Sequence, residues 1–415
     1  MPRLPGAPPL LTMPLGSSGA GEGQWRKTLS CVQVYQLFKR ESQSVSSVKQ
    51  RENGGNMNSK SDHCETVLQE TSSSKSNDIK ILQDCVHGFL ASKVLFTACE
   101  LGIFEILAES MTPLTSKCVA EHIGASINRT TCLLNACVAL KFLEKDCQNE
   151  EVCYKNTELS RLYLTKTSCK SMLRTMIHYS NEVFPAFMLL KDCVRQGVPL
   201  CRLTSESKGN DCFKHMYRSE ESILQFMQFM DSSTFLFGKE ESISTFDLSC
   251  FKTICDLGGC TGRLAKTCGS LYPESSIIVY DLPKIIQVAC EHFTGGDSKI
   301  SFQQGNFFED PIPDADLFIL SHILHDWDDE MCLKLLKKVY MACNPGGGIL
   351  IIDAVLNEAE EGPAIIHLQN VVMQMICDGK ERTATEFKTL LVTAGFKDIQ
   401  FSTKGIITNG ILARK

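Results

Sequence analysis

The feature that most constrains the fold is a change of rhythm after Phe251, where short apolar runs begin to alternate with helical patterns. A helix is expected over Arg263–Leu271, directly after the first run. Such alternation is typical of a parallel, doubly wound α/β sheet, in which ligands bind at the carboxyl ends of the strands. The expected strands are residues 253–257, 277–280, 300–302, 317–320, 348–352, 399–401 and 410–413.

The chain before the sheet divides into two further parts. Residues 1–76 are rich in polar residues, Gly and Pro, and bury too little apolar surface to offset the entropy of ordering, so disorder is expected there. Residues 77–200 are mainly helical, and residues 201–415 carry the sheet.

Within the helical part, residues 114–123 and 128–143 form a pair of helices joined by a turn at Gly124. Such a helix-turn-helix serves DNA binding or, as a winged-helix module, dimerisation. The second helix carries only Arg129 and Lys141 as bases, which favours dimerisation.

The composition narrows the functional class. The formal net charge is −6, which argues against nucleic-acid binding. The 21 cysteines lie mostly within apolar runs, as buried reduced thiols do, and they lack the paired C-x-x-C spacing of a zinc ribbon. No run reaches the roughly 18 to 20 apolar residues that span a bilayer. These features predict a cytoplasmic protein with no membrane, nucleic-acid or metal requirement.

The first strand leads into a glycine-rich loop over residues 256–262, D-L-G-G-C-T-G. Glycines let backbone approach a ligand closely, and this loop suits a dinucleotide or S-adenosylmethionine. It lacks the G-x-G-x-x-G spacing of the dinucleotide fingerprint. Asp281 ends the second strand, 19 residues after Gly262, where an acid can bind ribose hydroxyls or cap the next helix.

Four segments together carry a more specific signal. The series D-L-G-G-x-x-G, V-Y-D-L-P, Q-G-N-F-F-E-D-P-I-P-D-A-D and I-L-H-D-W-D-D-E resembles the class I S-adenosylmethionine-dependent small-molecule O-methyltransferases. The resemblance extends from about residue 77 to the C-terminus. It implies a Rossmann-like methyltransferase domain over residues 201–415 and a winged-helix dimerisation domain over residues 77–200. It also implies a homodimer that methylates a small aromatic hydroxyl.

The resemblance assigns the cofactor contacts to five matching positions. They are Tyr217, Gly258, Asp281, Asn306 and Phe307.

Three cofactor-site positions depart from the family pattern. Asn306 stands where an Asp is expected, and Thr234 where a Trp is expected. His322 replaces an Arg, and is shorter and mostly neutral at pH 7. These departures support one alternative, a catalytically weak homologue that acts as a dimeric binding or regulatory protein.

His325 lies just after the fourth strand, where a base could remove the proton of a hydroxyl nucleophile. A structural role at the next helix is the alternative from the residues alone, and the resemblance favours catalysis. The resemblance places acids that orient His325 at Glu381 and Asp353, the latter where the family has Glu.

The substrate contacts implied by the resemblance are Asn370 and Gln374, four residues apart on one expected helix, Ala364–Ile376. Their amides would pair with an amide of the substrate. Asp326, beside His325, is a further candidate for contact with the substrate.

Overall fold

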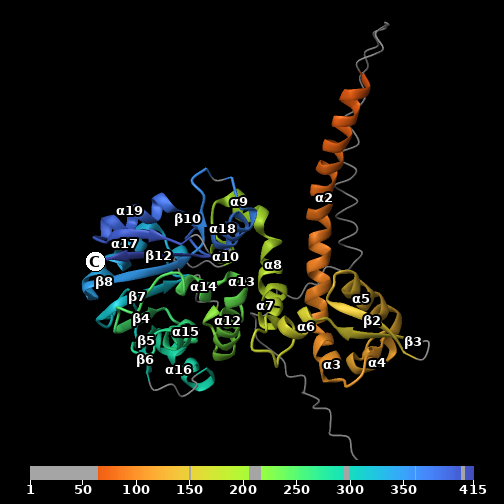
Figure 1. The fold of residues 1–415 in the computed structure, drawn as a ribbon, viewed down its shortest axis with the longest axis horizontal. Coiled ribbons are helices and arrows are strands. Elements are labelled where there is room, and N and C mark those ends of the chain that lie inside the picture. The colour runs from red at the N-terminus through yellow and green to blue at the C-terminus, as the bar shows by residue number, and fades with distance from the viewer. Residues whose placement is uncertain (1–63, 149–150, 205–215, 294–298, 360, 403–406) are drawn as a thin grey trace, which may run out of the picture. The chain divides into compact units, whose positions relative to one another are not determined.

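The computed structural model describes residues 64–148, 151–204, 216–293, 299–359, 361–402 and 407–415 (Figure 1). The chain divides into two compact units, residues 1–77 and Asp78–Lys415, and the second contains both sheets described here. Helix α2, Cys64–Glu100, begins inside the segment predicted to be disordered, and residues 64–76 contain no Gly or Pro to break it. The rest of that segment, residues 1–63, lies outside the described residues.

The N-terminal module surrounds a small antiparallel sheet of order β1-β3-β2. The predicted helix-turn-helix is present as α4 and α5, with Gly124 in the left-handed region at φ 64°. The second helix is shorter than predicted, because Leu143 pairs with Asn156 in a β-hairpin instead of continuing α5. The elements are α3 Ile103–Glu109, β1 Leu114–Thr115, α4 Ser116–Ile123, α5 Ile127–Ala139, β2 Leu143–Gln148, β3 Glu151–Asn156 and α6 Glu158–Tyr163.

Helices rich in Met and Phe connect this module to the large sheet. They are α7 Leu173–His178, η1 Tyr179–Val183, α8 Phe184–Phe187, α9 Leu190–Gln196, α10 Leu200–Thr204, α12 Glu220–Ser232, α13 Thr234–Phe237 and α14 Lys239–Ile243. Within the described ranges, no helix is long and apolar enough to cross a membrane.

The large sheet has seven strands in the order β11-β12-β8-β7-β4-β5-β6 (Figure 1). All seven predicted strands are present, and the first has the predicted bounds. They are β4 Thr253–Leu257, β5 Ser276–Asp281, β6 Ile300–Gln304, β7 Ala315–Ser321, β8 Cys343–Asp353, β11 Lys397–Phe401 and β12 Asn409–Arg414.

The prediction of a wholly parallel sheet was wrong at one strand. β12 runs antiparallel to both β8 and β11. The reason is the short connection over residues 402–408, because a parallel crossover needs about a dozen residues or more.

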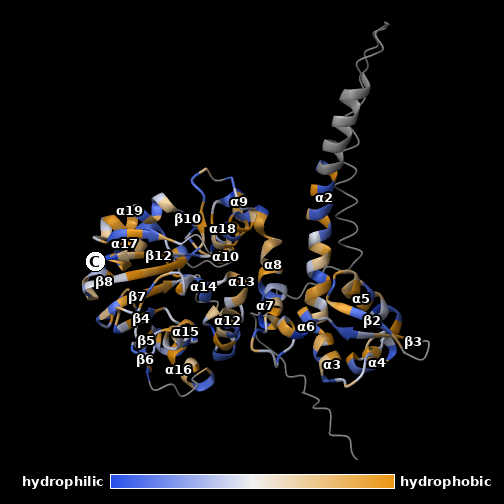
Figure 2. Ribbon diagram, in the orientation of Figure 1, coloured by the Kyte–Doolittle hydropathy of each residue, from blue (hydrophilic) through white to orange (hydrophobic). Residues whose placement is uncertain are grey.

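Helices cover both faces of this sheet (Figure 1). One apolar core joins β7 and β8 to α17 and α19, and a second joins β4 to α14 and α15. Strand β8 is buried over its last seven residues and is largely apolar there (Figure 2). The helices are α15 Arg263–Leu271, α16 Pro283–His292, α17 Asp329–Ala342, α18 Ala364–Ile376 and α19 Ala384–Ala394, with the short strands β9 Val355–Leu356 and β10 Arg382–Thr383.

Candidate active site

The glycine-rich loop leaves β4 and turns back against β5. The backbone N–H of Gly258 donates to the carbonyl of Tyr280 over 2.8 Å, and Gly258 has φ 77°. A Cβ at Gly258 would collide with the Ile323 side chain, and one at Gly259 would lie 2.8 Å from the Asp256 carboxyl carbon. The loop therefore needs glycine at both positions.

Asp281, at the end of β5, is tied directly to this loop. Its Oδ2 accepts the N–H of Cys260 over 2.9 Å, and its Oδ1 accepts the N–H of Leu282 over 2.7 Å. Burial raises the pKa of Asp281 to about 6, and those two backbone hydrogen bonds oppose the rise. The N-cap of α16 is Leu282, with no side-chain cap hydrogen bond, so Asp281 does not cap that helix.

The segment after β6 brings Asn306 and Phe307 toward the loop. The Oδ1 of Asn306 accepts the N–H of Phe308 over 3.0 Å, so the amide that replaces the expected Asp supports its own turn. The Phe307 ring would be an immediate neighbour of a Cβ at Gly258. The Lys338 ammonium donates to the Phe307 carbonyl over 2.9 Å and holds the segment against α17.

Tyr217 is partly buried and Thr234 is fully buried. Burial raises the pKa of Tyr217 well above its usual value, and the nearby carboxylate of Asp281 adds to the rise. Thr234 is 2% exposed, and its hydroxyl donates to the Met230 carbonyl over 3.5 Å.

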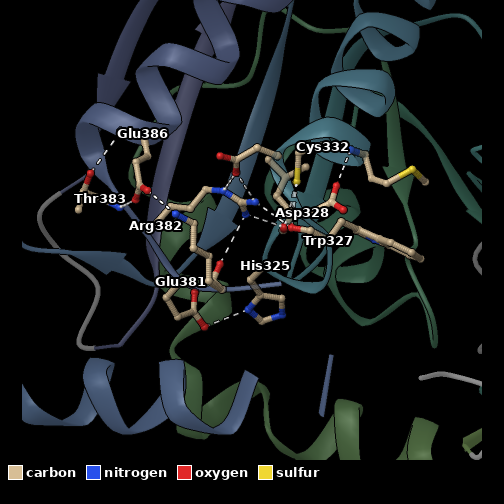
Figure 3. Close-up of polar contacts among 12 residues, drawn as sticks. His325, Trp327, Asp328, Cys332, Glu381, Arg382, Thr383 and Glu386 are labelled. Carbon is tan, nitrogen blue, oxygen red and sulfur yellow. Dashed lines mark hydrogen bonds and ion pairs between the residues drawn. The ribbon is translucent and has the colours of Figure 1, made fainter. Parts of the chain in front are cut away.

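The short 3-10 helix η2, Leu324–Asp326, follows β7 and carries His325. His325 Nδ1 lies 3.0 Å from Glu381 Oε1, and the two side chains are only 8% and 3% exposed (Figure 3). When the imidazole is neutral and Nδ1 donates its proton to the carboxylate, Nε2 is the nitrogen left with a lone pair. The structure therefore joins two of the three residues predicted to be catalytic, His325 and Glu381, by a hydrogen bond.

The turn that carries His325 is held by Arg382, a residue that the sequence analysis did not predict. Arg382 is fully buried on β10 and donates to the carbonyls of Leu324 and Trp327, each over 2.8 Å (Figure 3). It also pairs with Asp329 Oδ1 over 2.8 Å. The only sequence signal was its position next to Glu381.

The loop that carries Glu381 depends on two further residues. A Cβ at Gly379 would overlap the His325 carbonyl oxygen, so only glycine lets the two segments approach. Asn370 Oδ1, on α18, accepts the N–H of Glu381 over 3.0 Å. Asn370 thus positions Glu381 and keeps its NH₂ group for another partner, while Gln374 is exposed on the same helix.

Asp353 and Asp326 add negative charge around His325. Asp353 is fully buried, and within the described residues neither of its carboxylate oxygens has a hydrogen-bond partner. Asp326 Oδ1 lies 3.7 Å from His325 Nε2. Burial raises the pKa of Asp353 to about 7 and that of Asp326 to about 6. Glu381, and not Asp353, makes the hydrogen bond that orients His325.

These acids determine the protonation of His325. Burial lowers the pKa of His325, but Glu381, Asp353 and Asp326 outweigh it and raise the pKa to about 10. The resting site therefore favours a protonated imidazole.

His322 lies beside His325 and not on the surface. It adopts the left-handed φ of 56°, and its ring centroid is 4.9 Å from that of His325 and 5.1 Å from that of Phe237. Burial lowers the pKa of His322 well below its usual value, and the nearby Lys239 lowers it further. His322 is therefore neutral at physiological pH.

Lys239, the first residue of α14, was also missed by the sequence reading. It is 5% exposed, and burial lowers its pKa to about 8 although Asp353, Asp256 and Asp326 pull the other way. The sequence around Lys239 gives no sign of its burial, because the residues that bury it are distant in the chain.

A glycine loop after β4, an aspartate at the end of β5 and a histidine after β7, all at one edge of this sheet order, are typical of the class I methyltransferase architecture. A family model described as the O-methyltransferase domain matches residues 187–397, and one described as the O-methyltransferase dimerisation domain matches residues 83–166. The chain belongs to this family of S-adenosylmethionine-dependent O-methyltransferases, as the resemblance predicted.

Curated relatives and a solved structure share most of the chain. Acetylserotonin O-methyltransferase of Gallus gallus is 44% identical over 79% of this chain and 95% of its own length. The Homo sapiens protein of that name is 42% identical over 83% and 99%. The crystal structure of human N-acetylserotonin methyltransferase in complex with S-adenosylmethionine gives a TM-score of 0.78 at 40% identity, and covers 86% of this chain and 99% of that one.

Proposed function

We propose that the chain methylates the aromatic hydroxyl of N-acetylserotonin to give melatonin. The observation that carries the proposal is the pair of His325 and Glu381, in which Glu381 holds Nδ1 and leaves Nε2 for the substrate once the ring is neutral. The identity to acetylserotonin O-methyltransferases over about four fifths of the chain supports the choice of substrate.

The residues present fit the cofactor. At Gly258 and Gly259 the backbone has no room for a Cβ atom, so the loop can approach a ligand closely. The Asp281 carboxylate lies next to this loop. S-adenosylmethionine supplies the methyl group on a positively charged sulfur, and that charge disfavours a positive charge on His325. Gly258, Asp281, Phe307, Asn306 and Tyr217 would hold it.

His325 would then act as the base. Its Nε2 takes the proton of the substrate hydroxyl, and Glu381 stabilises the imidazolium that forms through the hydrogen bond to Nδ1. Arg382 and Gly379 hold the turn that carries His325 close to the loop that carries Glu381. Asp353 stabilises the positive charge of the imidazolium through space, without a hydrogen bond to the ring.

Substrate recognition would use the NH₂ group of Asn370, the exposed amide of Gln374 and the carboxylate of Asp326. Asn370 has its carbonyl oxygen committed to Glu381 N, so it can only donate to the substrate's acetyl carbonyl through its NH₂. The amide that recognises the substrate thus also positions the acid behind the base.

We further propose a homodimer formed through the N-terminal module. The dimerisation family model matches residues 83–166, and α2 exposes a row of large apolar side chains at helical spacing. They are Ile79, Leu82, Val86, Phe89 and Leu90, between 53% and 68% exposed.

A cytoplasmic location is also proposed, from the cysteines. Buried cysteines of the described residues such as Cys99, Cys137 and Cys255 are reduced thiols outside any disulfide. Reducing compartments keep thiols in this state.

The function is tested by titrating S-adenosylmethionine in a calorimeter and then measuring methyl transfer to N-acetylserotonin, serotonin and a simple phenol. We expect saturable cofactor binding and the highest kcat/KM for N-acetylserotonin. Asn370→Ala should narrow the difference between N-acetylserotonin and serotonin. Equal rates on all three acceptors would contradict the assigned substrate, and absent cofactor binding would favour the weak homologue.

A further inference from the structure

Three side chains at the catalytic edge have the composition of a metal site. One ligand atom each from His322, His325 and Asp353 lies within 4.8 Å of the other two. All three flank one end of the sheet, with His322 and His325 after β7 and Asp353 at the end of β8. Two imidazoles and one carboxylate are a frequent ligand set for divalent transition metals that keep an open coordination position.

The state of these atoms distinguishes the cluster from an ordinary polar core. His322 Nε2 and both carboxylate oxygens of Asp353 are buried and have no hydrogen-bond partner within the described residues. Unpaired buried polar atoms are costly, so their presence on two of the three side chains of this cluster indicates a missing ligand.

The third ligand is already oriented as metal sites require. A metal-bound imidazole usually donates its other N–H to a carboxylate, which fixes the ring and raises its basicity. Glu381 Oε1 takes this position at 3.0 Å from His325 Nδ1, so Nε2 points its lone pair away from Glu381.

We propose that His322, His325 and Asp353 bind one divalent transition-metal ion, with Zn²⁺ as the best match, and that its occupation stops methyl transfer. Metal–ligand bonds of about 2.0–2.2 Å in a tetrahedron place ligand atoms roughly 3.4 Å apart, so the widest pair contracts by at most about 1.4 Å. The inhibitory part rests on the proposed function, because the ion occupies the lone pair that His325 would use as base.

Lys239 allows a test in which two kinds of variant should change the metal affinity in opposite directions. Its amine is close enough to lower the pKa of His322 and to feel Asp353, so its positive charge opposes a second cation. Removing it should strengthen metal binding, whereas removing any of the three ligands should weaken it.

The experiment uses Co²⁺ as a spectroscopic probe on the full-length protein, with Zn²⁺ as competitor. We expect one equivalent of Co²⁺ to give visible d–d absorption without a sulfur-to-metal charge-transfer band, and Zn²⁺ to abolish it. His322→Asn and Asp353→Asn should each remove the signal, and Glu381→Gln should weaken affinity about 10- to 100-fold. His292→Asn, an exposed histidine on α16, is the matched control and should bind as wild type.

The same protein is assayed for methyl transfer at increasing Zn²⁺. Inhibition that follows the Co²⁺ affinity and weakens in His322→Asn supports the proposal. A thiolate band, unchanged binding in the ligand variants or weaker binding in Lys239→Met would overturn the metal site. Specific binding with undiminished turnover would leave the metal site standing and refute His325 as the base.

Discussion

The catalytic edge of the sheet and helix α2 depart from the ordinary distribution of side chains in opposite directions. At the edge, charged groups are hidden, with Asp353 fully buried and Lys239 only 5% exposed. On α2, apolar side chains face outward, with Leu82 at 68% and Val86 at 64% exposed. Buried charge and exposed apolar rows are the informative exceptions to the burial rule.

Both departures fit the binding of a partner, a small molecule at the sheet edge and a second protein surface at α2, as proposed above. Buried charge costs folding free energy unless a ligand or counter-charge uses it, and an apolar row is tolerated when a second surface covers it. The sheet edge is thus the proposed site for small molecules, and α2 the proposed surface for a second copy of the chain. Four variants test this comparison.

The largest expected effect is on turnover. His325→Ala should lower kcat by about 10² to 10⁴, the usual contribution of a general base, and leave cofactor affinity nearly unchanged. Stopped-flow or single-turnover methyl transfer measures it. His325→Gln, which keeps a donor for Glu381, controls for loss of packing, and near-normal turnover in both variants would refute the assignment.

The next effect is on cofactor affinity. Asp281→Ala should weaken S-adenosylmethionine binding about 10- to 100-fold, because charged hydrogen bonds are worth about 1.5 to 3 kcal/mol each. Calorimetry measures the dissociation constant, with the exposed Asp314→Ala as control. An unchanged constant would show that Asp281 serves only the Cys260 and Leu282 backbone.

The third variant addresses α2. Changing Leu82 and Phe89 together to Lys should convert the dimer to monomers, because two buried charges would enter an apolar interface. Size-exclusion chromatography with light scattering reports the mass. Val392→Lys, on an apolar residue of α19 that is 62% exposed, should leave the mass unchanged. Loss of the dimer in the control as well would contradict the assigned interface.

The smallest effect concerns the stability cost of Lys239. Its pKa is about 8 in the folded protein against 10.5 for the ordinary group, so burial of the ammonium destabilises the fold below pH 8. Lys239→Met should be more stable than wild type by about 1 to 3 kcal/mol at pH 7.5 without cofactor.

The pH dependence gives the sign of this effect. Between pH 8 and 10.5 Lys239 is protonated in the unfolded chain but not in the folded protein. The free energy of unfolding of the wild type therefore rises with pH relative to that of the variant. Denaturant titrations of both proteins at pH 7.5 and 10 measure the difference in their free energies of unfolding, which should be smaller at pH 10. A variant that is less stable at pH 7.5 would show that the surrounding acids stabilise Lys239 more than burial penalises it.

Local pattern was enough for much of the fold. The bounds of β4, α15 and α18 are as predicted, because apolar spacing along a short segment reports directly which face is buried. The glycine loop and Asp281 were also predicted from their places at the carboxyl ends of two strands, whereas the prediction for His325 came from the family resemblance.

The tertiary structure decided which distant residues meet at that edge. It chose Glu381 over Asp353 as the hydrogen-bond partner of His325, placed Arg382 beneath the same turn and buried Lys239 among the acids. It also reversed β12. Periodicity carries no information on the separation of segments far apart in the chain, and hydrogen bonds depend on that separation to within tenths of an ångström.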